Sequence, residues 1–192
     1  MSENKTKLII GLGNLDAKYN DTRHNTGFKI LDDLADHHKA SWQTKTKFKS
    51  VVAEISSFGQ KAILAKPTTY YNLSGEAARA ICDFYKIESD NVLAIHDELA
   101  LPFGTIRTRV GGSSAGNNGI KSLIAHIGQD FLRIRVGIAN DHSDQKPADQ
   151  FVLNHFTEDE QKRFRALELA AFKFVDDFIN DSKNFAHDSV KV

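Results

Sequence analysis

The stretch "KLIIGLGN", Lys7 to Asn14, contains a short apolar run that ends in two glycines and an asparagine. Its first five residues, Lys7 to Gly11, have the pattern of a short buried strand, and the glycines that follow predict a turn. A buried strand that is followed by helical segments is typical of an α/β domain, in which helices cover the sheet.

The rest of the chain continues this alternation of strands and helices. Helical spacing of apolar residues occurs in "TGFKILDDLADHHKA", "SGEAARAICDFYKI", "NNGIKSLIAHIG" and "TEDEQKRFRALELAAFKFVDDFIN". Strand patterns occur in "FKSVVAEISSFGQKAILAKP", which predicts two strands around a turn, and in "NVLAIHDEL", "GTIRTRVGG" and "FLRIRVGIAN". We therefore predict one three-layer α/β/α domain over residues 1–192, with a central, twisted, mixed and largely parallel sheet. The last residues, "SKNFAHDSVKV", are expected to be loosely held.

Composition excludes several classes of protein. The 25 basic and 25 acidic residues give no net charge, so any contact with nucleic acid has to come from a local patch. Cys82 is the only cysteine, which excludes an internal disulfide and a cysteine-based zinc site and fits a reducing, cytoplasmic setting. We expect neither a signal peptide nor a membrane span, because the apolar runs are too short.

Two residues, His24 and Asp97, are of the types that general-base catalysis needs. A neutral histidine becomes a useful base when a carboxylate holds its other ring nitrogen in one tautomer. Asparagine amides both donate and accept hydrogen bonds, so they can orient a water molecule or stabilise an oxyanion. Such asparagines, in glycine-rich or turn contexts, are Asn14, Asn72, Asn117 and Asn118. The pattern indicates water attacking an ester or amide.

Each of these features also has a purely structural interpretation. A histidine before a helix is more often structural than catalytic, and an aspartate at a strand end is often a turn or cap residue. "GLGN" lacks the full dinucleotide-binding pattern, and "GGSSAGNNG" lacks the G-K-[ST] ending of a phosphate loop. Four strand arginines fit either exposed faces or a local phosphate-binding patch: Arg107, Arg109, Arg133 and Arg135.

Several blocks, in order, resemble the bacterial peptidyl-tRNA hydrolase family over nearly the full chain. They are "LIIGLGN", "YNDTRHNTGF", "KPTTYYNLSGEA", "HDELALPFGTIRTRVGGSSAGNNGIKSLI", "FLRIRVGI" and "FVLNHF". The resemblance implies an α/β/α domain that is usually monomeric and uses neither a cofactor nor a metal. It also implies hydrolysis of the ester that joins a peptide to the 3′ end of tRNA, so that the tRNA is recycled.

The resemblance further implies roles for single residues. His24 matches the catalytic base, Asp97 the acid that orients it, and Asn118 the asparagine that places the water and supports the oxyanion. The resemblance implies further substrate-binding positions at Asn14, Tyr19, Tyr71, Asn72 and Asn117. It also implies a basic surface for the acceptor end of the tRNA, formed by Arg107, Arg109, Lys121 and Arg133.

Three places depart from the family's usual pattern. Leu15 and Asp16 stand where the first loop normally has Pro-Gly, and Tyr71 stands where a methionine is usual. Asn117 replaces the histidine of G-G-H-N-G, and an amide cannot carry a proton or a charge. These departures leave open a second hypothesis, a tRNA- or ribosome-binding protein with little turnover. A nucleotide-binding α/β protein is a third and more remote alternative.

We expect Asn117 to weaken the reaction or alter substrate preference rather than to abolish it. The variant Asn117→His should therefore hydrolyse an N-blocked aminoacyl-tRNA faster than the natural chain in a steady-state assay. An unchanged or lower rate would count against this expectation.

Overall fold

The structure is a computed structural model that describes residues 6–57, 59–180 and 188–192. Its strands are β1 (Lys7–Gly11), β2 (Gln43–Lys45), β3 (Ser50–Ser57), β4 (Gln60–Pro67), β5 (Val92–Pro102), β6 (Thr105–Val110), β7 (Leu132–Ala139) and β8 (Ser189–Lys191). Its α-helices are α1 (Thr26–His37), α2 (Ser74–Tyr85), α3 (Asn118–Ile127), α4 (Ala148–Phe151) and α5 (Glu158–Ile179). Two short 3₁₀ turns carry site residues, η2 (Arg23–Asn25) and η4 (Tyr71–Leu73).

The strands form one mixed sheet in the order β2-β3-β4-β1-β5-β7-β6-β8. The parallel pairs are β4–β1, β1–β5 and β5–β7, at the centre, and antiparallel pairs flank them on both sides. The mixed sheet predicted from the sequence is thus confirmed, with its parallel pairing confined to the four central strands.

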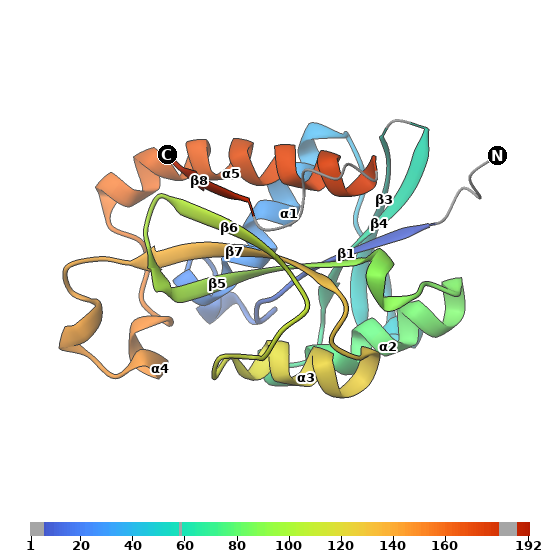
Figure 1. Cartoon of the computed structure of the whole chain (residues 1–192), viewed down its shortest axis with the longest axis horizontal. Helices are drawn as coiled ribbons and strands as arrows, with labels where there is room; N and C mark the ends of the chain where they lie inside the picture. Colours follow the sequence, from blue (N-terminus) through green and yellow to red (C-terminus); the bar gives the residue numbers. More distant parts are fainter. Residues whose placement is uncertain (1–5, 58, 181–187) are drawn as a thin grey trace.

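Helices cover both faces of this sheet (Figure 1). Helices α1 and α5 pack on one face, and α2 and α3 pack on the other. Successive residues of β1 alternate between the two layers, because side chains along a strand point to opposite faces. Ile9 belongs to the core between the sheet and helices α1 and α5, whereas Leu8 and Ile10 belong to the core between the sheet and helices α2 and α3. The three-layer α/β/α arrangement agrees with the sequence prediction.

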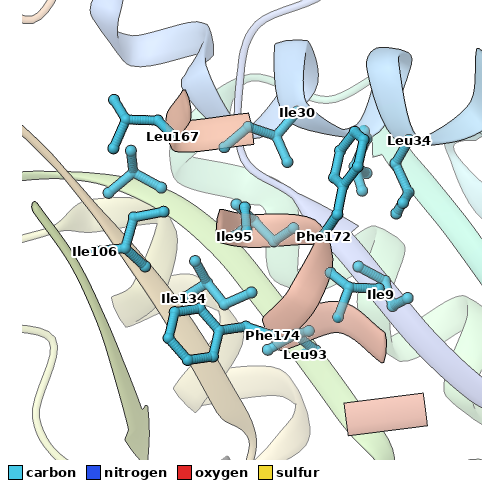
Figure 2. Packing of buried hydrophobic residues seen from close by; sticks show 14 of the residues in the cluster. Ile9, Ile30, Leu34, Leu93, Ile95, Ile106, Ile134, Leu167, Phe172 and Phe174 are labelled. Atoms are coloured by element: carbon cyan, nitrogen blue, oxygen red, sulfur yellow. The ribbon is translucent and has the colours of Figure 1, made fainter. Parts of the chain in front are cut away.

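The core beneath α1 and α5 is a dense contact of aliphatic and aromatic side chains (Figure 2). Strands β1, β5 and β7 supply Ile9, Ile95 and Ile134, each fully buried. The helices contribute Ile30, Leu34, Leu167, Phe172 and Phe174 to the same cluster. Burying a side chain of this size stabilises the fold by roughly 1.5–3 kcal/mol, so this layer holds the central strands in place.

Glycine at position 27 lets α1 begin directly beside the ends of β1 and β5. A Cβ atom on Gly27 would lie 2.4 Å from the carbonyl oxygen of Ile95 and 2.5 Å from the backbone nitrogen of Leu12. Any larger residue would push the helix away from the sheet. The close approach brings the residues that precede α1 to the carboxyl edge of the parallel strands, where ligands bind in open α/β sheets.

Several sequence-based boundaries need correction. Residues 188–192 are not loose, since β8 pairs with β6 and the backbone nitrogen of Val192 donates to Gly104 at 2.7 Å; residues 182–187 lie outside the described part. Ser74 is the first residue of α2, and its hydroxyl donates to the carbonyl of Tyr71 at 2.8 Å. A capping box of Thr157 and Glu160 begins α5. Within the described ranges, no helix is long and apolar enough to cross a bilayer.

One carboxyl group is buried between α5 and α1 in an acidic neighbourhood. Glu168 is 5% exposed and lies 3.7 Å from Nζ of Lys29 and 3.1 Å from Nη1 of Arg165. Burial, together with the neighbouring Asp33 carboxyl, raises the pKa of Glu168 to about 7, against the opposing effect of the two cations. The folded chain therefore binds this proton more tightly than the unfolded chain does.

This raised pKa predicts a pH dependence of stability. The contribution of protonated Glu168 is complete below its unfolded pKa of 4.5 and is lost as pH rises through about 7. In urea titrations between pH 5 and 8, Glu168→Gln should flatten the fall in the free energy of unfolding with pH. Glu54→Gln, at an exposed site beside Lys61, is the control and should leave the slope unchanged. An identical slope in all three proteins would contradict the prediction.

Candidate active site

The structure brings His24 and Asp97 into direct contact. Pairing between β1 and β5 ends at Gly11 and Ile95, so Asp97 lies just beyond the end of β1. His24 reaches it from η2, with 2.9 Å between its Nδ1 atom and Oδ2 of Asp97. The side chain of Asp97 is 4% exposed and that of His24 is 20% exposed. With Nδ1 engaged by the carboxylate, Nε2 is the ring nitrogen left to accept a proton.

The carboxylate of Asp97 has a second hydrogen-bond donor on its other oxygen. The hydroxyl of Tyr71 donates to Oδ1 of Asp97 at 2.7 Å. Burial alone would raise the pKa of Asp97, but His24 and the hydrogen bonds from His24 and Tyr71 hold that pKa below its usual range. Asp97 is therefore a charged carboxylate at neutral pH, which is the state that supports a neighbouring imidazolium.

The other histidine of this strand, His96, belongs to the interior. Its Nδ1 atom lies 2.7 Å from the carbonyl oxygen of Asp97, and the side chain is buried. Burial lowers the pKa of His96, so its ring is neutral at physiological pH. Of the two adjacent polar residues in "HDEL", only Asp97 faces the site.

Asn14 and Asn25 fix the loop after β1 against the turn that carries His24. The backbone nitrogen of Asn14 donates to Oδ1 of Asn25 at 2.8 Å, and Nδ2 of Asn25 donates back to the carbonyl of Asn14 at 2.9 Å. Oδ1 of Asn14 accepts a bond from the backbone nitrogen of Tyr71 at 2.8 Å. Asn25 is also the N-cap residue of α1, but its side chain makes no cap bond, because it is engaged by the loop after β1.

The remaining predicted asparagines divide into two exposed residues and one that faces inward. Asn72 in η4 and Asn118 at the start of α3 are exposed, and neither side-chain amide has a hydrogen-bond partner among residues 6–57, 59–180 and 188–192. Asn117 uses both ends of its amide inside the protein: Oδ1 accepts from the backbone nitrogen of Ile120 at 3.0 Å, and Nδ2 donates to the Tyr71 hydroxyl at 2.9 Å. Tyr19 is half-buried and is the last residue of a short 3₁₀ turn (Ala17–Tyr19) that precedes η2.

A buried ion pair that the sequence analysis missed anchors the turn carrying His24. Arg23 is 2% exposed, and its Nη2 and Nη1 atoms lie 2.6 and 3.1 Å from the two carboxylate oxygens of Glu160. Nη1 also donates to the carbonyl of Ile138 at 3.1 Å. The guanidinium is 4.7 Å from the ring centroid of Phe151 and 4.8 Å from that of Phe156. Bidentate, charge-assisted bonds of this kind are strong and directional.

Comparisons with known proteins agree with this geometry. The family model described as peptidyl-tRNA hydrolase matches residues 8–191. The chain belongs to the peptidyl-tRNA hydrolase family. The peptidyl-tRNA hydrolase of Geobacillus kaustophilus is 47% identical over 156 residues, which cover 81% of this chain and 83% of that protein. The peptidyl-tRNA hydrolase of Gloeobacter violaceus is 44% identical over 162 residues, which cover 84% of this chain and 81% of that protein.

Solved structures of the peptidyl-tRNA hydrolase family share this fold. The crystal structure of peptidyl-tRNA hydrolase from Acinetobacter baumannii is similar with a TM-score of 0.85 at 32% identity. The match covers 93% of this chain and 90% of that one. One departure from the family's usual loop proves mild, because Asp16, where glycine is usual, has φ −60° and ψ 135°. This extended conformation is open to any residue.

Four arginines lie on one face of the β6–β7 ladder. Arg107 is directly opposite Arg135, and Arg109 is directly opposite Arg133. Like charges in this relation destabilise a sheet unless an anion joins them. Glu98 neutralises part of the charge, with its Oε2 atom 3.0 Å from Nε of Arg135. A hollow of about 480 Å³ is lined by Arg107, Thr108, Arg109, Arg135, Asp188 and Ser189.

Arg133 differs from the surface residue that the sequence suggested. It is 3% exposed, and its guanidinium donates to the carbonyls of Gly112 and Ser113 at 2.5 and 2.7 Å. Burial, with Arg109 and Arg135 nearby, lowers the pKa of Arg133 to about 10. Arg133 thus braces the glycine-rich loop from within, whereas Arg107 and Lys121 are exposed. In the described ranges, no three His, Cys, Asp or Glu side chains are grouped to hold a metal ion.

The buried pair of Arg23 and Glu160 predicts a large effect on stability. Arg23→Met removes one partner and leaves the Glu160 carboxylate enclosed, so the free energy of unfolding should fall by about 3–5 kcal/mol, measured by urea titration. Arg79→Met, which breaks the exposed pair with Asp83 on α2, is the control and should change stability little. Equal losses in both variants would refute the anchoring role of Arg23.

Proposed function

We propose that this protein hydrolyses the ester between a peptide and tRNA, with His24 as the general base and Asp97 as the residue that orients it. The observation that carries the proposal is the 2.9 Å contact between Nδ1 of His24 and Oδ2 of Asp97, at the carboxyl edge of the parallel strands. Membership of the peptidyl-tRNA hydrolase family supplies the substrate class.

In the proposed reaction, a water molecule attacks the ester carbonyl while Nε2 of His24 takes one of its protons. The resulting imidazolium is stabilised by the ionised Asp97. When the tetrahedral intermediate collapses, the bond between the carbonyl carbon and the ribose oxygen breaks. The imidazolium returns its proton to that oxygen, which restores the terminal hydroxyl of the tRNA. The peptide is released as a carboxylic acid, which loses the second proton of the water to solvent and becomes a carboxylate.

Side-chain amides around this pair suit the remaining tasks. We assign Asn118 to placing the water and supporting the oxyanion, because its amide is exposed at the first turn of α3. Asn72 and Asn14 are assigned to binding the peptide. Nδ2 of Asn14 is still available, because the bond from Tyr71 engages only the side-chain oxygen, Oδ1. Tyr19 is assigned to the 3′ end of the tRNA.

The tRNA backbone is proposed to bind the arginine-bearing face of β6 and β7. Phosphate groups placed between Arg107, Arg109 and Arg135 would relieve the repulsion between these opposed cations. Lys121 on α3 extends the basic surface. We further propose that residues 1–192 act as one unit, as a monomer in the cytoplasm.

The proposal predicts that loss of either member of the pair stops turnover. His24→Ala and Asp97→Asn should lower kcat for an N-blocked aminoacyl-tRNA by about 100- to 10,000-fold, with tRNA binding retained. His38→Ala, at the far end of α1, is the control and should keep the natural rate. The rate of the natural chain should also fall at acid pH, because a protonated imidazole cannot accept the water's proton.

Two outcomes would count against this assignment. A pH–rate profile that stays flat down to pH 5 would speak against His24 as the base. Binding of tRNA without hydrolysis by the natural chain would favour the alternative of a tRNA-binding protein built on the same fold.

A further inference from the structure

We propose that Tyr71 is a positioning residue for the reaction, which holds the Asp97–His24 pair in its productive geometry, and that Asn117 acts through the Tyr71 hydroxyl. The proposal rests on the proposed function of His24 and Asp97. It differs from the sequence-based interpretation, in which Tyr71 and Asn117 both contact the substrate. Tyr71 is 5% exposed, so its hydroxyl serves the interior of the site.

The ring of Tyr71 supports the imidazole of His24 from one side. The two ring centroids are 3.6 Å apart, and the ring planes differ by 14°. A parallel contact this close restricts rotation of the imidazole about its bond to Cβ. It also denies that face of the imidazole to water, so the exposed part of His24 is directed towards the open side of the site.

The hydroxyl of Tyr71 fixes the rotation of the Asp97 carboxylate. Oδ1 accepts from Tyr71 at 2.7 Å, while Oδ2 lies 2.9 Å from Nδ1 of His24, so each carboxylate oxygen has its own partner. Burial, with the nearby charge of Asp97, raises the pKa of Tyr71 well above its usual value. The phenol therefore remains a proton donor throughout the working pH range.

Tyr71 is itself held from two further elements. Its backbone nitrogen donates to Oδ1 of Asn14, in the loop after β1. Its ring lies against α3 at Gly119, where a Cβ atom would be 2.5 Å from Cε1 of Tyr71. Glycine at position 119 is thus required for the ring to occupy this place, and the ring cannot shift without moving the helix.

Asn117 completes the chain of hydrogen bonds. Its Nδ2 atom donates to the Tyr71 oxygen at 2.9 Å, so the hydroxyl can direct its own proton only towards Asp97. The Oδ1 atom of Asn117 simultaneously caps α3 through the backbone nitrogen of Ile120. The departures at positions 71 and 117 therefore form one unit that links the start of α3 to the Asp97–His24 pair.

Steady-state kinetics of Tyr71→Phe, Asn117→Ser and the double variant test the proposal. Phenylalanine keeps the ring and removes the hydroxyl, and serine keeps a good helix cap but is too short to reach Tyr71. We expect Tyr71→Phe to lower kcat about tenfold with KM within about twofold. The double variant should match Tyr71→Phe alone, because Asn117 acts through the missing hydroxyl. Tyr85→Phe, at the far end of α2, is the control.

A pH profile separates positioning from a merely structural role. Charged or titratable groups around the Tyr71 hydroxyl are Asp97, His24, His96 and Glu98. Without the hydroxyl's bond, Asp97 retains more of its negative charge for the imidazolium. The acid limb of the pH–rate profile of Tyr71→Phe should therefore move to higher pH, while that of Tyr85→Phe stays in place.

Two results would overturn the proposal. The first is a Tyr71→Phe variant with the same kcat as the natural chain and an acid limb at the same pH. The second is a double variant whose fold-reduction in kcat equals the product of the fold-reductions in the two single variants. If the natural chain itself is inactive, the proposed function fails. The Nδ1 proton resonance of His24 then decides the role of Tyr71, since it should shift in Tyr71→Phe and Asn117→Ser but not in Tyr85→Phe.

Discussion

The ion pair between Arg23 and Glu160 fixes the position of His24, the proposed base. One carboxylate serves three structures at once: it accepts two bonds from Arg23, one from Asn140, and one from the backbone nitrogen of Thr157 at the start of α5. The residue after Arg23 is His24, so the start of α5 and the position of His24 are structurally linked. A histidine in a loop thereby acquires the fixed position that loops rarely provide.

Sequence patterns were sufficient for the layers and for the contact between His24 and Asp97, because apolar periodicity and parallel-strand topology are local or general rules. The two residues could be paired because the sequence places both near element ends, and the carboxyl ends of parallel strands lie at one edge of the sheet. Patterns did not show that Arg133 is buried, since alternation assigns it to a face without revealing which loop covers that face. They missed β8 because three residues carry no readable period. The inward direction of Tyr71 and Asn117 depends on contacts between residues 46 positions apart.

A chain without net charge can still present a strongly cationic surface if its charges are segregated. In the β6–β7 ladder, Arg107 lies opposite Arg135, and Arg109 lies opposite Arg133, which is itself buried. Glu98 neutralises part of this charge, and the remaining repulsion between like charges opposes folding. The buried pair at Glu160 and the apolar layer under α1 and α5 offset that cost elsewhere.

The short strand β8 has a consequence for synthesis of the protein. It is the last strand among the described residues, and it pairs with the outer edge of β6, where Ser189 lies opposite Arg107 and Val190 opposite Ile106. Until residue 191 has left the ribosome, β6 is an edge strand whose unpaired backbone N–H and C=O groups can pair with a strand of another chain. The arginines along β6 then protect the nascent sheet, since two such cationic edges repel each other before they can pair.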